Sequence, residues 1–283
     1  MWASWCSSGC RTAPETGRKQ LVLIPEEQEI AMGELAYRDI LANTPESKDE
    51  QLRRIVQRVG ERIAAVAGRP DYRWEFHLLS VPEPNAFCLP GGKIAVFEGI
   101  LPVCENEAGL AAVLSHEVAH ALARHGGERM SQGLVVSAVE LGLKWGLKDR
   151  DAVARERILQ AYGIASKYGV LLPYSRKHEL EADAIGLRLM ARAGYDPHEA
   201  VRLWQRFADF NRGQRIPEFF STHPSDTHRA RALAELMPEA ERLYAAAERR
   251  MGTGQRLSVG TERAQSVEQP QPAGSGTQPG RNR

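Results

Sequence analysis

Two histidines and a glutamate near the middle of the chain have the types and spacing of a metal-binding helix. His116 and His120 are four residues apart, and Glu117 directly follows the first. On an α-helix, residues four apart share one face, so two neutral imidazoles can bind the same divalent ion. Glu117 points to the side, where it can reach a water on that ion without being a ligand. The pattern His-Glu-x-x-His therefore predicts a zinc site with a base beside it.

The two histidines do not establish the site alone, because such five-residue patterns also arise by chance on amphipathic helices. A catalytic zinc needs a third protein ligand and keeps its fourth position open for water. Residues 179–183 offer carboxylates at Glu179, Glu181 and Asp183. An acidic stretch at the start of a helix is also favourable without any metal.

Helical spacing decides between these carboxylates. Glu179 and Asp183 are four residues apart and share a face, whereas Glu181 points about 200° away from Glu179. We predict that Glu179 is the third ligand. Asp183 should accept a hydrogen bond from the non-coordinating nitrogen of a zinc histidine. Glu181 should then face solvent or an arginine such as Arg188.

Helices with an apolar face should carry these residues. Residues 110–122 have apolar side chains at helical spacing, and Gly126-Gly127 should end this metal helix. The same periodicity, with capping residues, predicts further helices at 25–43, 47–67, 131–172 with a break at 148–151, 175–194, from 197 onward, and 229–244.

Two segments show the patterns of strands. Residues 74–78 alternate like a half-buried strand, and residues 85–97 indicate two short strands joined by a Pro-Gly-Gly turn. The second segment is either a plain hairpin or a sheet edge that offers backbone groups to an extended peptide beside the metal. On the latter interpretation the substrate-binding residues are Asn85, Ala86, Phe87, Gly91 and Gly92. The elements together predict an α+β fold, mostly helical, with a small β-sheet beside the metal helix.

Composition excludes some classes of function. The chain of 283 residues is 42% hydrophobic and 26% charged, with a net charge of +1 and no basic block, which argues against nucleic-acid binding. Four cysteines show no CxxC spacing, so a cysteine-based zinc site is not expected. Cys88 and Cys104 are either free buried thiols, which we favour, or a single disulfide.

No segment approaches the roughly 20 uninterrupted apolar residues that a transmembrane helix needs. The strongest candidate, Leu134 to Leu147, is broken by Glu140 and Lys144. We therefore interpret it as an amphipathic helix packed against the rest of the fold.

Both ends of the chain should lie outside the folded domain. Residues 1–20 are expected to be unstructured, although Ser8-Gly9-Cys10 resembles the end of a lipoprotein signal with a lipid anchor at Cys10. With that anchor the protein belongs in the periplasm or on a membrane of a bacterial envelope. With the N-terminus as written it is a soluble cytoplasmic protein. Residues 251–283 are rich in Gly, Gln, Ser and Pro and predict a disordered tail.

Four segments, in their order along the chain, resemble the M48 family of zinc metallopeptidases. They are the hairpin 85–97, the metal helix with 116–120, the stretch 175–183, and Ser221-Thr222-His223-Pro224. The resemblance runs from about residue 21 to residue 244, and the chain is similar to soluble and lipoprotein bacterial members related to Oma1. One departure is Cys88, where alanine is common.

The resemblance implies a gluzincin-type peptidase domain over residues 21–250 that binds one Zn²⁺ per subunit. It implies endopeptidase activity on protein or peptide substrates, often damaged or misassembled envelope proteins. His223 matches a histidine that either stabilises the transition state or plugs the idle site. The remaining roles implied are zinc ligands for His116, His120 and Glu179, general base for Glu117, and support of a ligand for Asp183.

The other histidines are interpreted as ordinary residues. His77 should be a strand residue, and His125, His178, His198 and His228 surface or capping residues. A non-catalytic chaperone or binding protein on the same scaffold, its cleft blocked by His223, is the alternative function. A structural zinc domain fits less well, because a closed site does not need Glu117.

Overall fold

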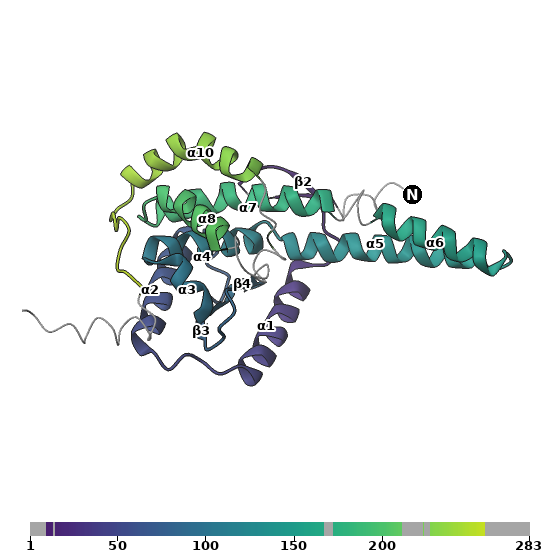
Figure 1. The fold of residues 1–283 in the computed structure, drawn as a ribbon, viewed down its shortest axis with the longest axis horizontal. Helices are drawn as coiled ribbons and strands as arrows, with labels where there is room; N and C mark the ends of the chain where they lie inside the picture. The colour runs from purple at the N-terminus through teal and green to yellow at the C-terminus, as the bar shows by residue number, and fades with distance from the viewer. Residues whose placement is uncertain (1–9, 14, 167–171, 211–222, 224–226, 258–283) are drawn as a thin grey trace, which may run out of the picture.

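A computed structural model describes residues 10–13, 15–166, 172–210, 223 and 227–257 (Figure 1). A body of helices surrounds a small sheet, and a pair of helices projects from one side of it. The fold is mostly helical α+β, as the sequence predicts.

Helix α4 (Glu107–Leu122) lies at the centre of the body. Nearly all of its side chains are buried, and it packs against α7 (Leu172–Arg192), α2 (Glu50–Val66), α8 (His198–Phe210) and the sheet. Asn106 caps its start by accepting a hydrogen bond from the Gly109 amide at 2.9 Å. The amides of Glu107 and Ala108, which a helix leaves unpaired, donate to backbone carbonyls of residues 255 and 253. The start of the central helix is therefore held both by the adjacent Asn106 and by a segment near residue 255, far along the chain.

The sheet has three strands in the order β3-β5-β4. Strand β3 (Glu75–Leu79) runs parallel to β5 (Lys93–Phe97), and β4 (Ala86–Leu89) pairs antiparallel with β5. The turn between β4 and β5 uses Gly91 and Gly92, both at positive φ, which favours glycine. The predicted hairpin is confirmed, and β4 is an edge strand that contacts α4.

Four more helices complete the described part of the body. α1 (Glu26–Asn43) packs along β4 and β5, and α10 (Thr227–Ala245) packs on α7 and α8. The short η1 (Glu98–Ile100) and α3 (Leu101–Cys104) connect the sheet to α4. Cys88 and Cys104 are free thiols, as favoured above.

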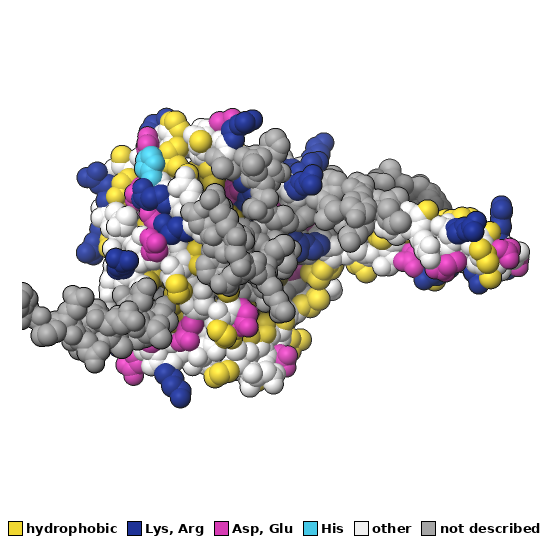
Figure 2. Space-filling model, viewed as in Figure 1, with side chains coloured by type: hydrophobic (Ala, Val, Ile, Leu, Met, Phe, Trp, Pro, Cys, Tyr) yellow, Lys and Arg dark blue, Asp and Glu magenta, His cyan; other side chains and the backbone are white. Residues whose placement is uncertain are grey.

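The projecting pair consists of α5 (His125–Gly146) and α6 (Ala152–Ser166), separated at the predicted break (Figure 1). The expectation that residues 134–147 pack against the fold is wrong. Leu141 and Trp145 are 69% and 74% exposed, because this half of α5 extends past the body and has α6 beside it (Figure 2). Among the described residues, no helix is both long enough and apolar enough to cross a bilayer.

The metal helix ends earlier than predicted. It ends at Leu122, and Gly126-Gly127 lie in the first turn of α5. Arg124, at φ 54°, interrupts the helical backbone between α4 and α5, and its guanidinium binds the buried carboxylate of Glu29 at 2.6 Å. A side chain at Gly127 would collide with Glu29. This glycine therefore permits close packing and does not stop the helix.

Both predicted unstructured tails include residues that belong to the folded part of the chain. Strands β1 (Cys10–Thr12) and β2 (Lys19–Leu21) pair antiparallel, so the expectation of an unstructured N-terminus is wrong for these residues. At the other end, residues 251–257 bond to the start of α4, and Leu257 is buried. Residues 1–9 and 258–283, which carry the rest of both expectations, lie outside the described residues.

Candidate metal centre

Two donor nitrogens come from α4. His116 and His120 lie on its face toward α7, and their Nε2 atoms are 3.1 Å apart. Burial lowers the pKa of His120 well below its ordinary value. Burial has the same effect on His116, but the carboxylates of Asp183 and Glu179 outweigh it and raise the pKa of His116 to about 9.

The third donor comes from α7. Glu179 Oε2 lies 3.3 Å from His116 Nε2, and its Oε1 lies 3.4 Å from His120 Nε2. The two helices approach closely because Gly186 faces the backbone of α4. A Cβ at this position would lie 3.0 Å from the amide nitrogen of His116. The predicted choice of Glu179 over Glu181 therefore agrees with the geometry.

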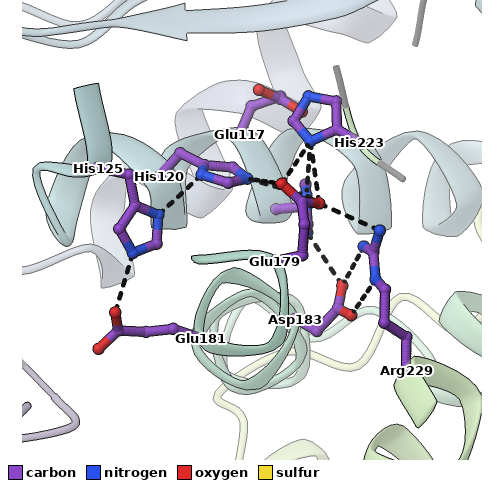
Figure 3. A network of polar contacts seen from close by, with 9 residues as sticks. Glu117, His120, His125, Glu179, Glu181, Asp183, His223 and Arg229 are labelled. Carbon is purple, nitrogen blue, oxygen red and sulfur yellow. Dashed lines mark hydrogen bonds and ion pairs between the residues drawn. The ribbon is translucent and has the colours of Figure 1, made fainter. Parts of the chain in front are cut away.

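A fourth donor comes from His223. Its Nδ1 lies 3.3 Å from His116 Nε2 and 3.1 Å from Glu179 Oε2 (Figure 3). Four donors at about 2.0–2.1 Å from a tetrahedral zinc are about 3.3 Å from each other. Five of the six pairs of these side chains have separations of 3.1–3.4 Å, close to that value, and all four donor atoms lie within 4.8 Å of one another. Two or three imidazoles and a carboxylate are also the ligands that zinc prefers.

Glu117 lies beside this cluster. Its carboxylate is buried, and Oε1 accepts no hydrogen bond from the described residues. His223 Nε2 is 3.4 Å from that oxygen. Burial raises the pKa of Glu117, so this carboxylate takes up a proton more readily than an exposed glutamate.

Asp183 and Arg229 form the layer behind the ligands. Asp183 Oδ1 lies 3.1 Å from His116 Nδ1, the nitrogen that faces away from the cluster. Arg229, at the start of α10, binds Asp183 through two nitrogens at 2.6 and 2.7 Å, and a third nitrogen lies 3.1 Å from Glu179 Oε2. The sequence reasoning missed Arg229. Its one signal is its position six residues after His223, on the same final segment.

The prediction that His125 and His178 are surface or capping residues is wrong. Their rings are buried and stacked with centroids 4.2 Å apart, and His125 Nδ1 lies 2.8 Å from His120 Nδ1. Burial lowers the pKa of His125 to about 4. Glu181 is also buried, and it binds Arg18 and His125, not solvent or Arg188. Their signals lie in contacts between distant segments, which helical spacing does not show.

The two remaining histidines of that prediction differ from these. His198 is exposed and pairs with Glu241, as expected of a surface residue. The side chain of His228 lies outside the described residues. His77 is a half-buried residue of β3 that pairs with Glu46, in agreement with its predicted strand position.

Residues 50–237 match the sequence family described as peptidase family M48. The chain belongs to the M48 family. A relative from Schizosaccharomyces pombe named "Mitochondrial metalloendopeptidase OMA1" is 46% identical over 188 residues, 66% of this chain and 53% of the relative. The protein of the same name from Saccharomyces cerevisiae is 33% identical over 251 residues, 82% of this chain and 70% of that protein.

A more distant relative is bacterial. The "Beta-barrel assembly-enhancing protease" of Escherichia coli is 26% identical over 221 residues, 75% of this chain and 44% of the relative. The chain thus spans about half the length of the S. pombe and E. coli relatives that it matches. The chain is thus an M48 family member in which His116, His120 and Glu179 come together in one donor cluster.

The predicted substrate-binding residues of this M48 peptidase do not share one environment. Gly91 and Gly92 are buried in the β4–β5 turn, against Ile30 and Trp74, so packing explains both glycines. Phe87 packs on Phe97, on the sheet face with Tyr37. Of the predicted residues, Asn85 and Ala86 therefore remain candidates for substrate binding near the metal. Cys88, also on β4, joins them as a candidate.

Proposed function

We propose that this M48 family member is a metalloendopeptidase that uses one zinc ion per subunit to hydrolyse peptide bonds in protein substrates. The observation that carries the proposal is the cluster of four donors, three buried and one (His120) half-buried, all within 4.8 Å of one another, with Glu117 Oε1 beside them accepting no hydrogen bond from the described residues. His116, His120 and Glu179 would hold the metal.

Glu117 supplies the proton chemistry. Zinc, when bound, lowers the pKa of water to about 7 and polarises a carbonyl. Glu117 takes a proton from the attacking water and passes it to the leaving amine, and its raised pKa suits both transfers. Asp183 Oδ1, 3.1 Å from His116 Nδ1, would keep His116 oriented by accepting its proton in a hydrogen bond when Nε2 holds the metal.

His223 closes the site in this arrangement. Its Nδ1 lies within 3.3 Å of His116 and Glu179 and would serve as a fourth ligand to a metal bound there, while its Nε2 faces Glu117. A peptide carbonyl and an attacking water need this space. We propose that His223 plugs the idle site and moves when substrate binds.

The edge of β4 is the proposed docking line for an extended substrate. The Phe97 amide donates to the Asn85 carbonyl, so Phe87 and Leu89 also bond to β5 and the backbone of Ala86 and Cys88 points outward. The Ala86 amide is already bound to the Asn85 side chain at 2.9 Å. Burial raises the pKa of the Cys88 thiol, and the Glu117 carboxylate adds to this effect, which places Cys88 on the Glu117 side of the sheet. A peptide that pairs with Cys88 would therefore pass the metal.

Damaged or misassembled envelope proteins are the proposed physiological substrates, with anchoring through a lipid on Cys10. The names of the mitochondrial and bacterial relatives support a role at a membrane-bounded compartment. Genomic sequence upstream of Met1 tests the anchor. An in-frame basic and apolar leader would support it, and a stop codon just before Met1 would refute it.

Casein cleavage tests the activity itself. Purified protein should degrade casein, lose activity on dialysis with a chelator, and regain it with Zn²⁺. Glu117→Gln keeps the shape of the side chain and removes the base, so turnover should fall by about 10²- to 10⁴-fold while zinc stays bound. Glu140→Gln, on the exposed part of α5, is the matched control and should be fully active. Substantial cleavage by Glu117→Gln would refute the assigned mechanism.

A further inference from the structure

A chain of polar contacts leads from the ligand His120 through His125 to Glu181 (Figure 3), and from Glu181 to Arg18 of the N-terminal segment. His125, the first residue of α5, turns its ring back toward α4, and its Nδ1 lies 2.8 Å from His120 Nδ1. Its Nε2 lies 2.9 Å from Glu181 Oε2. His125 and Glu181 are buried, so water does not compete for these contacts.

The chain of contacts has one consistent direction when His120 binds a metal. His120 offers Nε2 to the cluster, so its proton sits on Nδ1 and is donated to His125 Nδ1. His125 accepts at Nδ1 and therefore carries its own proton on Nε2, which it donates to Glu181. The opposite direction would place a proton on His120 Nε2 and block the ligand. The carboxylate at the far end thus favours the metal-binding tautomer.

Arg18 holds the far end of the chain of contacts. Its Nε binds Glu181 Oε2 at 2.7 Å, and its other nitrogens bind the two oxygens of Glu128 at 2.6 and 3.0 Å. Thr16 donates to the other oxygen of Glu181. Glu128 also binds His178, whose ring stacks on His125. The segment before α1 therefore fixes both carboxylates beneath the paired rings.

We propose that His125 is a positioning residue that fixes the tautomer and orientation of His120, and that Arg18 of the N-terminal segment anchors this relay. The proposal rests on the proposed zinc site. It makes residues 15–18 part of the metal centre, although they are more than 90 residues from the first ligand. Glu181 acts in the relay as an acceptor, separate from the coordinating Glu179.

Zinc affinity of the full chain tests the relay, measured by competition with a chromogenic chelator. His125→Phe keeps the ring that stacks on His178 and removes both nitrogens. We expect its zinc affinity to fall by about 10- to 100-fold, as for other residues that orient a metal ligand. Glu181→Leu should weaken binding similarly, whereas Glu181→Gln keeps an acceptor for His125 and should stay near wild type. His198→Phe, at an exposed histidine on α8, is the matched control.

Two further readouts separate positioning from simple stability. Urea unfolding of each variant without metal should show folded protein, because Glu181 keeps Arg18 and Thr16 as partners when His125 is lost. The visible absorption of the Co²⁺-substituted protein should change in His125→Phe, since the orientation of His120 is altered. Arg18→Met should lower zinc affinity and change the Co²⁺ absorption in the same way, but by smaller amounts than His125→Phe.

Zinc affinity of His125→Phe within twofold of wild type would overturn the proposal. So would equal losses in Glu181→Gln and Glu181→Leu, since the acceptor would then be irrelevant. If wild-type protein binds zinc but fails to cleave casein, the proposed function fails, and these binding measurements still decide the relay.

Discussion

Replacing Arg229 tests how strongly the layer behind the ligands depends on one buried cation. Arg229 is buried between α10 and α7, with two bonds to Asp183 and a 3.1 Å approach to Glu179. Its guanidinium also lies 3.9 Å from the centre of the Trp204 ring. Arg229→Met keeps much of the stem and leaves two buried carboxylates without this charge.

The expected cost is large in the metal-free protein. Removing one partner of a buried ion pair costs about 3–5 kcal/mol, because the other charge stays buried. Burial raises the pKa of Asp183, and Arg229 outweighs it and lowers that pKa, so the variant should bind a proton at Asp183 more readily. Zinc supplies positive charge at Glu179, so the loss should shrink when the metal is bound.

Arg188→Met is the matched control, because Arg188 joins the same two helices at the surface. It binds Glu239 of α10 at 2.9 and 3.0 Å, with both side chains partly exposed. Exposed pairs contribute about 0–1 kcal/mol. Urea unfolding with chelator and with saturating zinc measures both variants. Equal losses for the two variants, or a loss for Arg229→Met that zinc leaves unchanged, would refute the reasoning.

Three shorter predictions follow from other contacts. His223→Ala should raise basal casein cleavage, because it opens the fourth position; a lower rate with normal zinc content would instead indicate a transition-state donor. Gly186→Ala should force α7 away from α4 and reduce both zinc affinity and melting temperature, by about 1–3 kcal/mol in stability, whereas Gly142→Ala, with open space around it, should be tolerated. Finally, burial raises the pKa of Glu128, but its bonds to His178 and Arg18 outweigh this and lower it to about 2. Its contribution to stability should be present above pH 4.5 and be lost as pH falls toward 2, and Glu128→Gln should flatten the unfolding free energy of the metal-free protein over that range.

Helical spacing was sufficient to predict the two histidine ligands and the pairing of the ligand Glu179 with Asp183, because the two residues of each pair lie on one helix. His116 with His120, and Glu179 with Asp183, are four residues apart, and α4 and α7 are regular over both stretches. The edge strand could also be predicted, since β4 and β5 form a local hairpin. In these cases the relevant distance along the chain is a few residues.

The missed residues depend on distant contacts. Arg18 meets Glu181 across 163 residues, and Arg229 meets Asp183 across 46. Residues 10–20 show no apolar periodicity in the sequence. They are nevertheless ordered, because β1 pairs with β2 and Arg18 binds two carboxylates. The wrong prediction for α5 has a different cause. Its apolar residues predicted burial, but the sequence does not specify which element would cover them.

The treatment of Glu181 shows what helical geometry can and cannot decide. Its side chain does point away from Glu179, so the argument that both cannot ligate the same ion holds (Figure 3). The further step, that it must then face solvent, fails because His125 and Arg18 lie against its carboxylate. Arg124 in the left-handed conformation directs His125 to the side of α7 that carries Glu181. Three acids of one helix therefore serve the two α4 histidines in different ways. Glu179 faces both rings, Asp183 stands behind His116, and Glu181 acts on His120 through His125.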